Sequence, residues 1–200
     1  MTGPEATGGP RIGLLGGTFN PPHLAHLIVA QVVREGLGLD RVVLVPTAVH
    51  AFKGEAAASP RDRATMVELA VAGDPRLVAD RIEIQRGGTS YTVDTLRDLR
   101  SREPATRWHL IVGRDLLEEL PRWREAERLP ELAEIVVVGR GAESAPAAPP
   151  GFEGRSAFVP VPSLEISSTE IRRRVAAGRS IRYWVPPAVE AYVRERGLYR

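Results

Sequence analysis

Two histidines near the N-terminus, His23 and His26, are the residues whose type and spacing most directly suggest chemistry. They open a segment with helical periodicity, and positions i and i+3 share one helix face, so both imidazoles can point at the same group. Gly16 and Gly17 precede them, and glycines let the backbone approach a ligand closely. The helix start should also offer free N–H groups and a positive dipole end. The pattern predicts an anion site, and two donors there would suit the charge that builds up on a phosphoryl group during transfer.

Other interpretations of this histidine pair remain open. Histidines at this spacing also bind metals, but no third ligand lies nearby in the sequence, so we expect no metal site. Two exposed histidines at a helix start would be a simpler outcome, but it fits poorly with the run Gly-Gly-Thr-Phe-Asn-Pro-Pro before them. The chain contains neither GxxxxGKS/T nor GxGxxG, so a P-loop and an ordinary dinucleotide fingerprint are excluded.

A second candidate anion site lies far along the chain, in the sequence ISSTEIRRR. Ser167 and Glu170 form a capping-box pattern, which places a helix N-terminus at Ser168 and Thr169 with Arg172 one turn further on. Free N–H groups, two hydroxyls and a guanidinium could then converge on one anion. The alternative is a well-capped surface helix with solvated arginines.

The segments that must position these residues alternate short apolar runs with amphipathic stretches of helical length, which is typical of α/β proteins with a largely parallel sheet. We expect strands at 11–15, 41–46, 81–88, 107–113, 134–140 and 158–161. We expect helices at 24–37, 61–73 and 92–102, an interrupted helical stretch around LPRW, and two helices around a proline turn after residue 166. The small-residue segment 141–155 is expected to be a loop.

Composition limits the class of protein. A chain of 200 residues favours a single domain, here 11–200, after a short disordered lead-in over 1–10. No apolar run approaches the ~20 residues of a membrane span, and cysteine is absent, so we expect a cytoplasmic protein. The net charge is only +2, with acids and bases interleaved, which argues against a nucleic-acid partner and a membrane surface.

Lys53 is the only lysine among the 27 lysine and arginine residues. The composition favours arginine throughout, so a single lysine in a loop after an expected strand is either a chance survivor or a residue kept for a function.

The segments GGTFNPPHLAHL and ISSTEIR together resemble the nucleotidyltransferases of the HxGH superfamily. Within that superfamily the chain is similar to the bacterial nicotinate-nucleotide adenylyltransferases over nearly its whole length, from Arg11 to the C-terminus. Three further segments occur in the order and spacing of that family: RGGTSYTVDTLRDLR, IVGRDLLEELPRW and SIRYWVP.

The resemblance implies a Rossmann-like α/β fold with a mostly parallel central sheet flanked by helices. It also implies adenylyl transfer from ATP, with Mg²⁺, to nicotinate mononucleotide, which gives deamido-NAD and pyrophosphate in NAD biosynthesis. It assigns catalytic roles to His23, His26, Lys53 and Arg172. The ATP site that it implies consists of Gly16, Gly17, Thr18, Phe19, His23, His26, Gly113, Asp115, Ile166, Ser168, Thr169 and Arg172.

The resemblance places the acceptor nucleotide against Asn20, Lys53, Ser90, Tyr91, Thr92 and Trp123. The turn before a helix at Thr92 offers backbone N–H groups that suit the nicotinate carboxylate, and Trp123 matches a residue whose ring stacks on the pyridine. An amide in place of the carboxylate would set its NH₂ against a donor, so the acid should be preferred. Without the resemblance, an ordinary helix cap and a half-buried aromatic would be the simpler interpretations.

The chain departs from the family pattern at three positions. Ala25 replaces the glycine of HxGH and adds a methyl group where ATP approaches. Asn20 stands where aspartate is frequent, and Phe52 precedes Lys53 where histidine is usual. We expect activity to survive all three changes.

Three alternatives to this function stay open. An adenylyltransferase that prefers nicotinamide mononucleotide, or accepts both, would differ only around Thr92 and Trp123. A superfamily relative such as phosphopantetheine adenylyltransferase would not need that pair. A non-catalytic nucleotide-binding module is compatible with Ala25. Whether the chain forms a homo-oligomer is left open.

Overall fold

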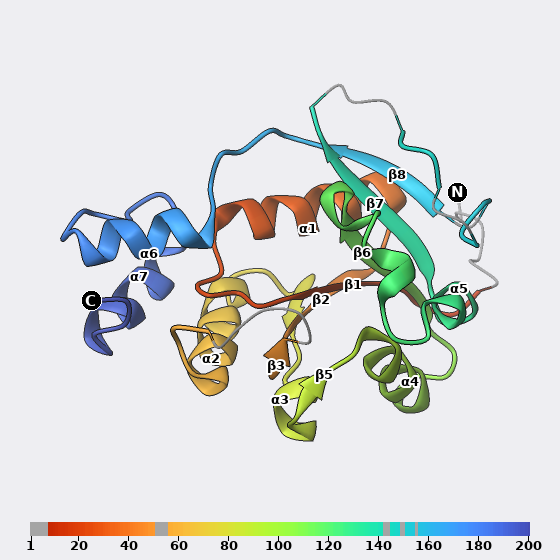
Figure 1. Ribbon diagram of the computed structural model, residues 1–200, viewed down its shortest axis with the longest axis horizontal. Helices are drawn as coiled ribbons and strands as arrows, with labels where there is room; N and C mark the ends of the chain where they lie inside the picture. The colour runs from red at the N-terminus through yellow and green to blue at the C-terminus, as the bar shows by residue number, and fades with distance from the viewer. Residues whose placement is uncertain (1–7, 51–55, 142–144, 149–150, 155) are drawn as a thin grey trace, which may run out of the picture.

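The structure is a computed structural model that describes residues 8–50, 56–141, 145–148, 151–154 and 156–200 (Figure 1). Its centre is a parallel sheet with strand order β4-β2-β1-β6-β7-β8. The strands are β1 (Arg11–Gly17), β2 (Arg41–Pro46), β4 (Leu77–Ala79), β6 (Arg107–Gly113), β7 (Glu134–Arg140) and β8 (Ser156–Val161). Long runs of Val, Ile and Leu form these strands because both faces of the sheet are covered.

The strand order reverses between β1 and β6. From β1 the chain builds outward through β2 to β4, and from β6 it builds outward the other way through β7 to β8. Ile12 pairs with Arg41 on one side and with Trp108 on the other, so both directions start from the same strand. Such a reversal opens a crevice beyond the carboxyl ends of the two central strands, where ligands of doubly wound α/β folds bind.

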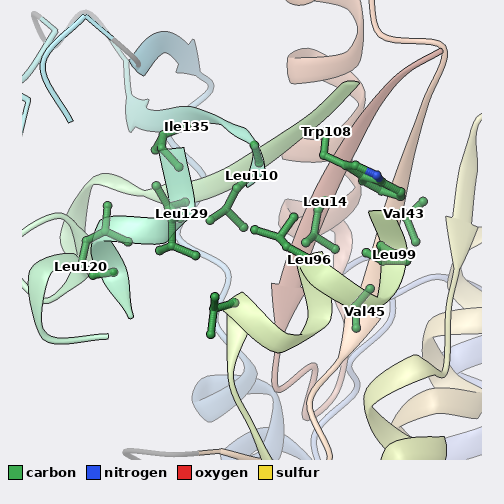
Figure 2. Close-up of a cluster of buried hydrophobic side chains, with 14 of the residues drawn as sticks. Leu14, Val43, Val45, Leu96, Leu99, Trp108, Leu110, Leu120, Leu129 and Ile135 are labelled. Atoms are coloured by element: carbon green, nitrogen blue, oxygen red, sulfur yellow. The ribbon is translucent and has the colours of Figure 1, made fainter. Parts of the chain in front are cut away.

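Helices cover both faces of the sheet. The helices α1 (Leu24–Leu37) and α2 (Pro60–Val71) share one buried cluster with β2 and with alternate residues of the other strands. On the opposite face, α4 (Thr92–Arg102) and the short α5 (Leu129–Leu132) pack against the other side of the strands. Figure 2 shows this second cluster, in which Leu96 and Leu99 of α4 lie close to Leu14, Val43 and Trp108.

The two C-terminal helices, α6 (Ser168–Ala176) and α7 (Pro187–Glu195), form a third cluster with α2. Ile171 of α6 and Val189 of α7 are fully buried there together with Met66 of α2. Figure 1 shows α6 and α7 gathered beside the beginning of α1, far in sequence from that helix. The packing therefore carries the second candidate anion site toward the first.

Most of the expected elements are present. The helix expected at 24–37 has those bounds, and Gly38 ends it in a left-handed conformation with φ 61°. The strands at 41–46, 107–113 and 134–140 also have the expected bounds. The helical stretch interrupted by LPRW consists of the 3₁₀ turns Arg114–Leu116, Leu120–Arg122 and Ala126–Arg128, followed by α5.

The expected strand at 81–88 is wrong. The segment forms a short helix, α3 (Ile82–Arg86), followed by β5 (Thr89–Ser90), which pairs with β3 (Val49–His50) in a separate small sheet. The alternation Ile-Glu-Ile suggested a strand, but Ile82 and the adjacent Glu83 are both buried, which a helical turn allows and a pleated strand of a half-exposed sheet does not. The sequence also gave no signal for β4, which has only three residues.

The division into a lead-in and one domain stays a prediction, and residues 1–7 of that lead-in lie outside the described residues. Among the described residues, no helix is long and apolar enough to cross a bilayer.

Candidate active site

The two histidines lie together at the start of α1. His23 is the N-cap residue and is only 6% exposed, and its ring stacks on that of His26 with centroids 3.7 Å apart. The backbone N–H of His23 donates to Nδ1 of His26 over 3.1 Å. Since Nδ1 accepts, the proton of a neutral His26 is on Nε2, which is free to act as a donor.

Burial keeps this pair uncharged at neutral pH. It lowers the pKa of His23 to about 4. It also lowers the pKa of His26 well below its usual value, and the neighbouring His23 adds to that effect. Nδ1 of His23 is buried and has no hydrogen-bond partner within the described part of the chain. A buried polar atom without a partner is costly, so it fits a site that a ligand completes.

The helix amides are less available to an anion than the sequence predicted. The N–H of Leu24, the first helical residue, donates to the carbonyl of Trp184 over 3.0 Å, and that of His26 donates to the carbonyl of His23. The carbonyl of Trp184 comes from the turn between α6 and α7, so the C-terminal region caps α1. The imidazole side chains therefore become the main donors at this helix start.

The second predicted site is brought to the first. The predicted cap is confirmed, because the Ser167 hydroxyl accepts from the N–H of Glu170 over 3.2 Å. The Ser168 hydroxyl donates to the carbonyl of Pro21 over 2.8 Å, and Nη1 of Arg172 donates to the carbonyl of Asn20 over 2.8 Å. Two residues of α6 thus hold the loop that leads from β1 into the histidines.

Other contacts involve the same loop and α6, which we call the α6 arm. The second terminal nitrogen of Arg172, Nη2, donates to Oγ1 of the exposed Thr169 over 3.2 Å. Oδ1 of Asn20 accepts from the Tyr199 hydroxyl over 2.8 Å, and Asn20 is 7% exposed. Its side-chain oxygen is therefore engaged by the C-terminal segment. Ile166 packs, partly buried, against the cluster formed by α2, α6 and α7.

The glycines mark open space at the crevice. A Cβ on Gly16, the exposed sixth residue of β1, would meet nothing within 4 Å. A Cβ on Gly17 would touch the ring of Phe19 at 3.2 Å, and one on Gly113, at the end of β6, would collide with the carboxylate of Asp115. Among the described residues, the open space therefore lies at Gly16, whereas Phe19 covers Gly17 and Asp115 covers Gly113.

The predicted acceptor residues come from two neighbouring segments. Thr92 begins α4 with Tyr91 as its N-cap, and Tyr91 and Trp123 both pack against the same buried cluster. The guanidinium of Arg124 lies 4.7 Å from the centre of the Tyr91 ring, which ties the two segments together. Ser90, just before Tyr91, accepts from the N–H of Ala48 over 3.0 Å. Lys53 and Phe52 lie outside the described residues.

Sequence reasoning missed Arg63. It lies on α2, is 2% exposed, and donates to the carbonyls of Thr18 over 2.7 Å, Ala48 over 2.9 Å and Ala58 over 3.3 Å. Burial lowers its pKa, but an arginine stays protonated at neutral pH. The buried guanidinium of Arg63 therefore binds the loop after β1 from the side of α2. An arginine on a helix in an arginine-rich chain gives no signal by which it could have been singled out.

In the described residues there is no group of three His, Cys, Asp or Glu side chains that could hold a metal ion. That the histidines bind phosphate rather than a metal stays a prediction.

A strand-order reversal beside the buried imidazole of His23 and the half-buried imidazole of His26, with a capped helix that carries an arginine nearby, is typical of the nucleotide-binding class of doubly wound α/β proteins. The cytidylyltransferase-like family matches residues 14–174. A relative from Thermus thermophilus named "Probable nicotinate-nucleotide adenylyltransferase" is 47% identical over 195 residues, which cover 95% of this chain and 100% of the relative. One of the same name from Salinibacter ruber is 42% identical over 190 residues, 94% of this chain and 97% of the relative. The chain belongs to the nicotinate-nucleotide adenylyltransferase family of nucleotidyltransferases.

A solved structure supports the same fold. The Plasmodium falciparum nicotinic acid mononucleotide adenylyltransferase complexed with NaAD has a TM-score of 0.78 to this chain at 19% identity, and the match covers 95% of this chain and 97% of that one. The Rossmann-like α/β fold expected from the sequence is confirmed.

The buried histidines should make stability depend on pH. Because the pKa of His23 falls from its usual 6.5 to about 4 on folding, the unfolded chain binds more protons between these values, so stability is lost as the pH falls from about 6.5 to 4. One pKa unit corresponds to about 1.4 kcal/mol, so His23 alone contributes on the order of 3 kcal/mol to this loss. Urea unfolding at pH 7 and pH 5 should show a smaller difference for His23→Gln than for the unmodified protein. An equal difference would contradict a buried neutral imidazole.

Replacing Arg63 by methionine should leave three backbone carbonyls without their donors, and we expect a loss of about 2–4 kcal/mol in the free energy of unfolding. Arg61→Met on the same helix is the matched control, since Arg61 is exposed and the charge change is the same. Its effect should stay within about 0.5 kcal/mol. Urea titration of both variants measures the difference, and similar losses would show that the three bonds do not stabilise the loop.

Proposed function

We propose that this protein transfers the adenylyl group of ATP to nicotinate mononucleotide, giving deamido-NAD and pyrophosphate. The observation that carries the proposal is the convergence of the two neutral histidines with the α6 arm at the strand-order reversal, in a chain that belongs to this family. Phosphoryl and nucleotidyl transfer need alignment and charge stabilisation more than covalent help from the protein, and this site offers hydrogen-bond donors for that purpose.

In the proposed reaction, a phosphate oxygen of the mononucleotide attacks the α-phosphorus of ATP in line with the bond to the bridging oxygen. The new P–O bond forms as the bond to pyrophosphate breaks, and the electron pair leaves with the pyrophosphate. His23 and His26 donate hydrogen bonds as charge moves onto the phosphate oxygens.

The α6 arm is proposed to hold the leaving pyrophosphate. Arg172 is fixed by the carbonyl of Asn20, so its guanidinium reaches the site with little freedom to lose on binding. The Ser168 hydroxyl donates a hydrogen bond to the carbonyl of Pro21, and the Thr169 hydroxyl accepts one from Arg172, so both hydroxyls help to position α6 beside the proposed phosphate site. Lys53 is proposed to reach the same phosphates from its loop.

The adenosine is proposed to lie along the glycine-rich ends of the two central strands. Gly16 and Gly17 end β1 and are followed by Thr18 and Phe19, Gly113 ends β6 and is followed by the turn that contains Asp115, and Ile166 is proposed to close the site from the α6 side. The open space in front of Gly16 is the observation that supports this placement.

The nicotinate ring is proposed to lie between the Tyr91–Thr92 turn and the segment of Trp123. The backbone N–H groups at the start of α4 would face the carboxylate, and Ser90 and Asn20 are proposed to lie nearby. An amide substituent would set one donor against another there, so we expect selectivity for the acid.

The described residues do not fit a resident metal. We therefore propose that Mg²⁺ enters with ATP as part of the substrate, held by phosphate oxygens. A cytoplasmic location and independence from nucleic acids and membranes remain predictions, as does the oligomeric state.

The function is tested by pyrophosphate release from ATP and Mg²⁺ with nicotinate mononucleotide, nicotinamide mononucleotide or phosphopantetheine as acceptor. We expect the acid to exceed the amide by at least about tenfold in kcat/KM, because one mispaired polar group costs about 1–3 kcal/mol. His23→Ala should lower kcat by about 10²–10³, the usual effect of losing one donor to developing charge. Gln31→Ala, on the exposed side of α1, is the control. Release with phosphopantetheine alone would overturn the proposed acceptor.

The space in front of Gly16 gives a second test. A methyl group there meets no atom of the described residues within 4 Å, so Gly16→Ala should fold normally but raise the KM for ATP by about tenfold or more, because the methyl occupies ligand space. Gly36→Ala in α1 is the control, since its Cβ would meet only Val159 at 3.7 Å. Steady-state kinetics of both variants measure the KM for ATP, and a thermal melt of each checks that it folds. Unchanged KM for ATP in Gly16→Ala would show that ATP does not approach this strand end.

A further inference from the structure

Glu83 is a buried carboxyl group that the proposed reaction does not use. It lies in the first turn of α3 and is 5% exposed. Its Oε1 accepts from the Thr95 hydroxyl over 2.6 Å, while its Oε2 is buried with no hydrogen-bond partner in the described part of the chain. Burial raises the pKa of Glu83, whereas Thr95, Ser90, Arg86 and Arg63 oppose that rise. Burial of a carboxyl group lowers the stability of the folded protein, so we expect Glu83 to have a role other than packing.

The two hydroxyls that face Glu83 lie on either side of the Tyr91–Thr92 turn. Ser90 precedes the turn at the end of β5, and Thr95, which is 1% exposed, follows it on α4. The Ser90 hydroxyl accepts from the N–H of Ala48 over 3.0 Å. It also lowers the pKa of Glu83, so it lies near that carboxyl group. Glu83 thus bonds directly to Thr95 after the turn, and Ser90 lies near it before the turn.

Neighbouring charges keep this arrangement in place. Arg86 donates to Oγ1 of Thr95 over 3.1 Å and to Asp98 over 2.7 Å, so the cation that faces Glu83 is itself fixed on α4. The charges of Arg63 and Glu83 also favour each other. Arg63 of α2 binds the carbonyls of Thr18 and Ala48, and the N–H of Ala48 donates to Ser90. These bonds link the loop after β1 to the segment of Ser90.

We propose that Glu83 is a positioning residue for the acceptor nucleotide: its hydrogen bond with Thr95, whose hydroxyl also lies 3.3 Å from the carbonyl oxygen of Tyr91, fixes the start of α4 so that the Tyr91–Thr92 turn presents a fixed aromatic ring and fixed backbone amides to the substrate. This inference rests on the proposed function, which assigns the turn to the nicotinate mononucleotide. Glu83 touches no substrate itself. Its effect should therefore appear in the binding of the acceptor and leave the phosphate chemistry intact.

The first test compares Glu83→Gln, Thr95→Val and Thr95→Ser in steady-state kinetics. Thr95→Val keeps the shape of the side chain and loses the hydroxyl, while Thr95→Ser keeps the hydroxyl. We expect Glu83→Gln and Thr95→Val to raise the KM for nicotinate mononucleotide by about tenfold, with kcat and the KM for ATP within about twofold, and Thr95→Ser to restore most of the loss. Glu131→Gln, at an exposed carboxylate, is the matched control and should change neither KM.

Hydrogen exchange separates this inference from the proposed function, because it needs no turnover. In Glu83→Gln, amide exchange over 89–95 should become faster while exchange over 12–15, in β1, stays unchanged. If the unmodified protein does not use nicotinate mononucleotide but exchange in Glu83→Gln still changes only over 89–95, the proposed function is wrong and the positioning role of Glu83 is supported. Equal KM increases for both substrates together with a lower Tm would overturn the inference, as would an unchanged KM for the acceptor or unchanged exchange over 89–95.

Discussion

The reversal of strand order between β1 and β6 is the constraint on which the rest of the site depends. All six strands of the main sheet are parallel, so their carboxyl ends meet at one edge, and the chain leaves the two central strands in opposite directions. That divergence leaves the backbone of Gly16 open, where an added Cβ would meet nothing within 4 Å among the described residues. The histidines of α1 lie beside this opening because α1 is the first element after β1.

The C-terminal helices complete the site by holding its loop. Arg172 and Ser168 bind carbonyl groups of the loop before α1, and the carbonyl of Trp184 caps the first amide of α1. Arg63 binds the same loop from α2. The result is a loop held from both sides, beside which His23 is buried, His26 is half-buried and both are neutral. Pre-organised neutral donors in a water-poor site stabilise developing charge more effectively than mobile ones in water.

Much of this arrangement could be predicted from the sequence, and the reasons for the failures are physical. The helix of His23 and His26 and the cap at Ser167 depend on local periodicity and local hydrogen bonds, which sequence patterns record. The helix at 82–86 was mistaken for a strand because two tertiary partners, Thr95 and Ser90, draw Glu83 inward. The contacts of Arg63 and of the Trp184 carbonyl join distant segments, and no local pattern encodes them.

The account depends most on the two histidines being neutral and facing the triphosphate. The most direct test is a ¹⁵N NMR spectrum of the protein labelled at its four histidines, recorded at pH 6 with and without MgATP. We predict that His26 carries its proton on Nε2, that both His23 and His26 are neutral without ligand, and that MgATP shifts these two while the distant, buried His109 stays unchanged. Signals of His23 and His26 that titrate near 6.5 and do not respond to MgATP would contradict the account.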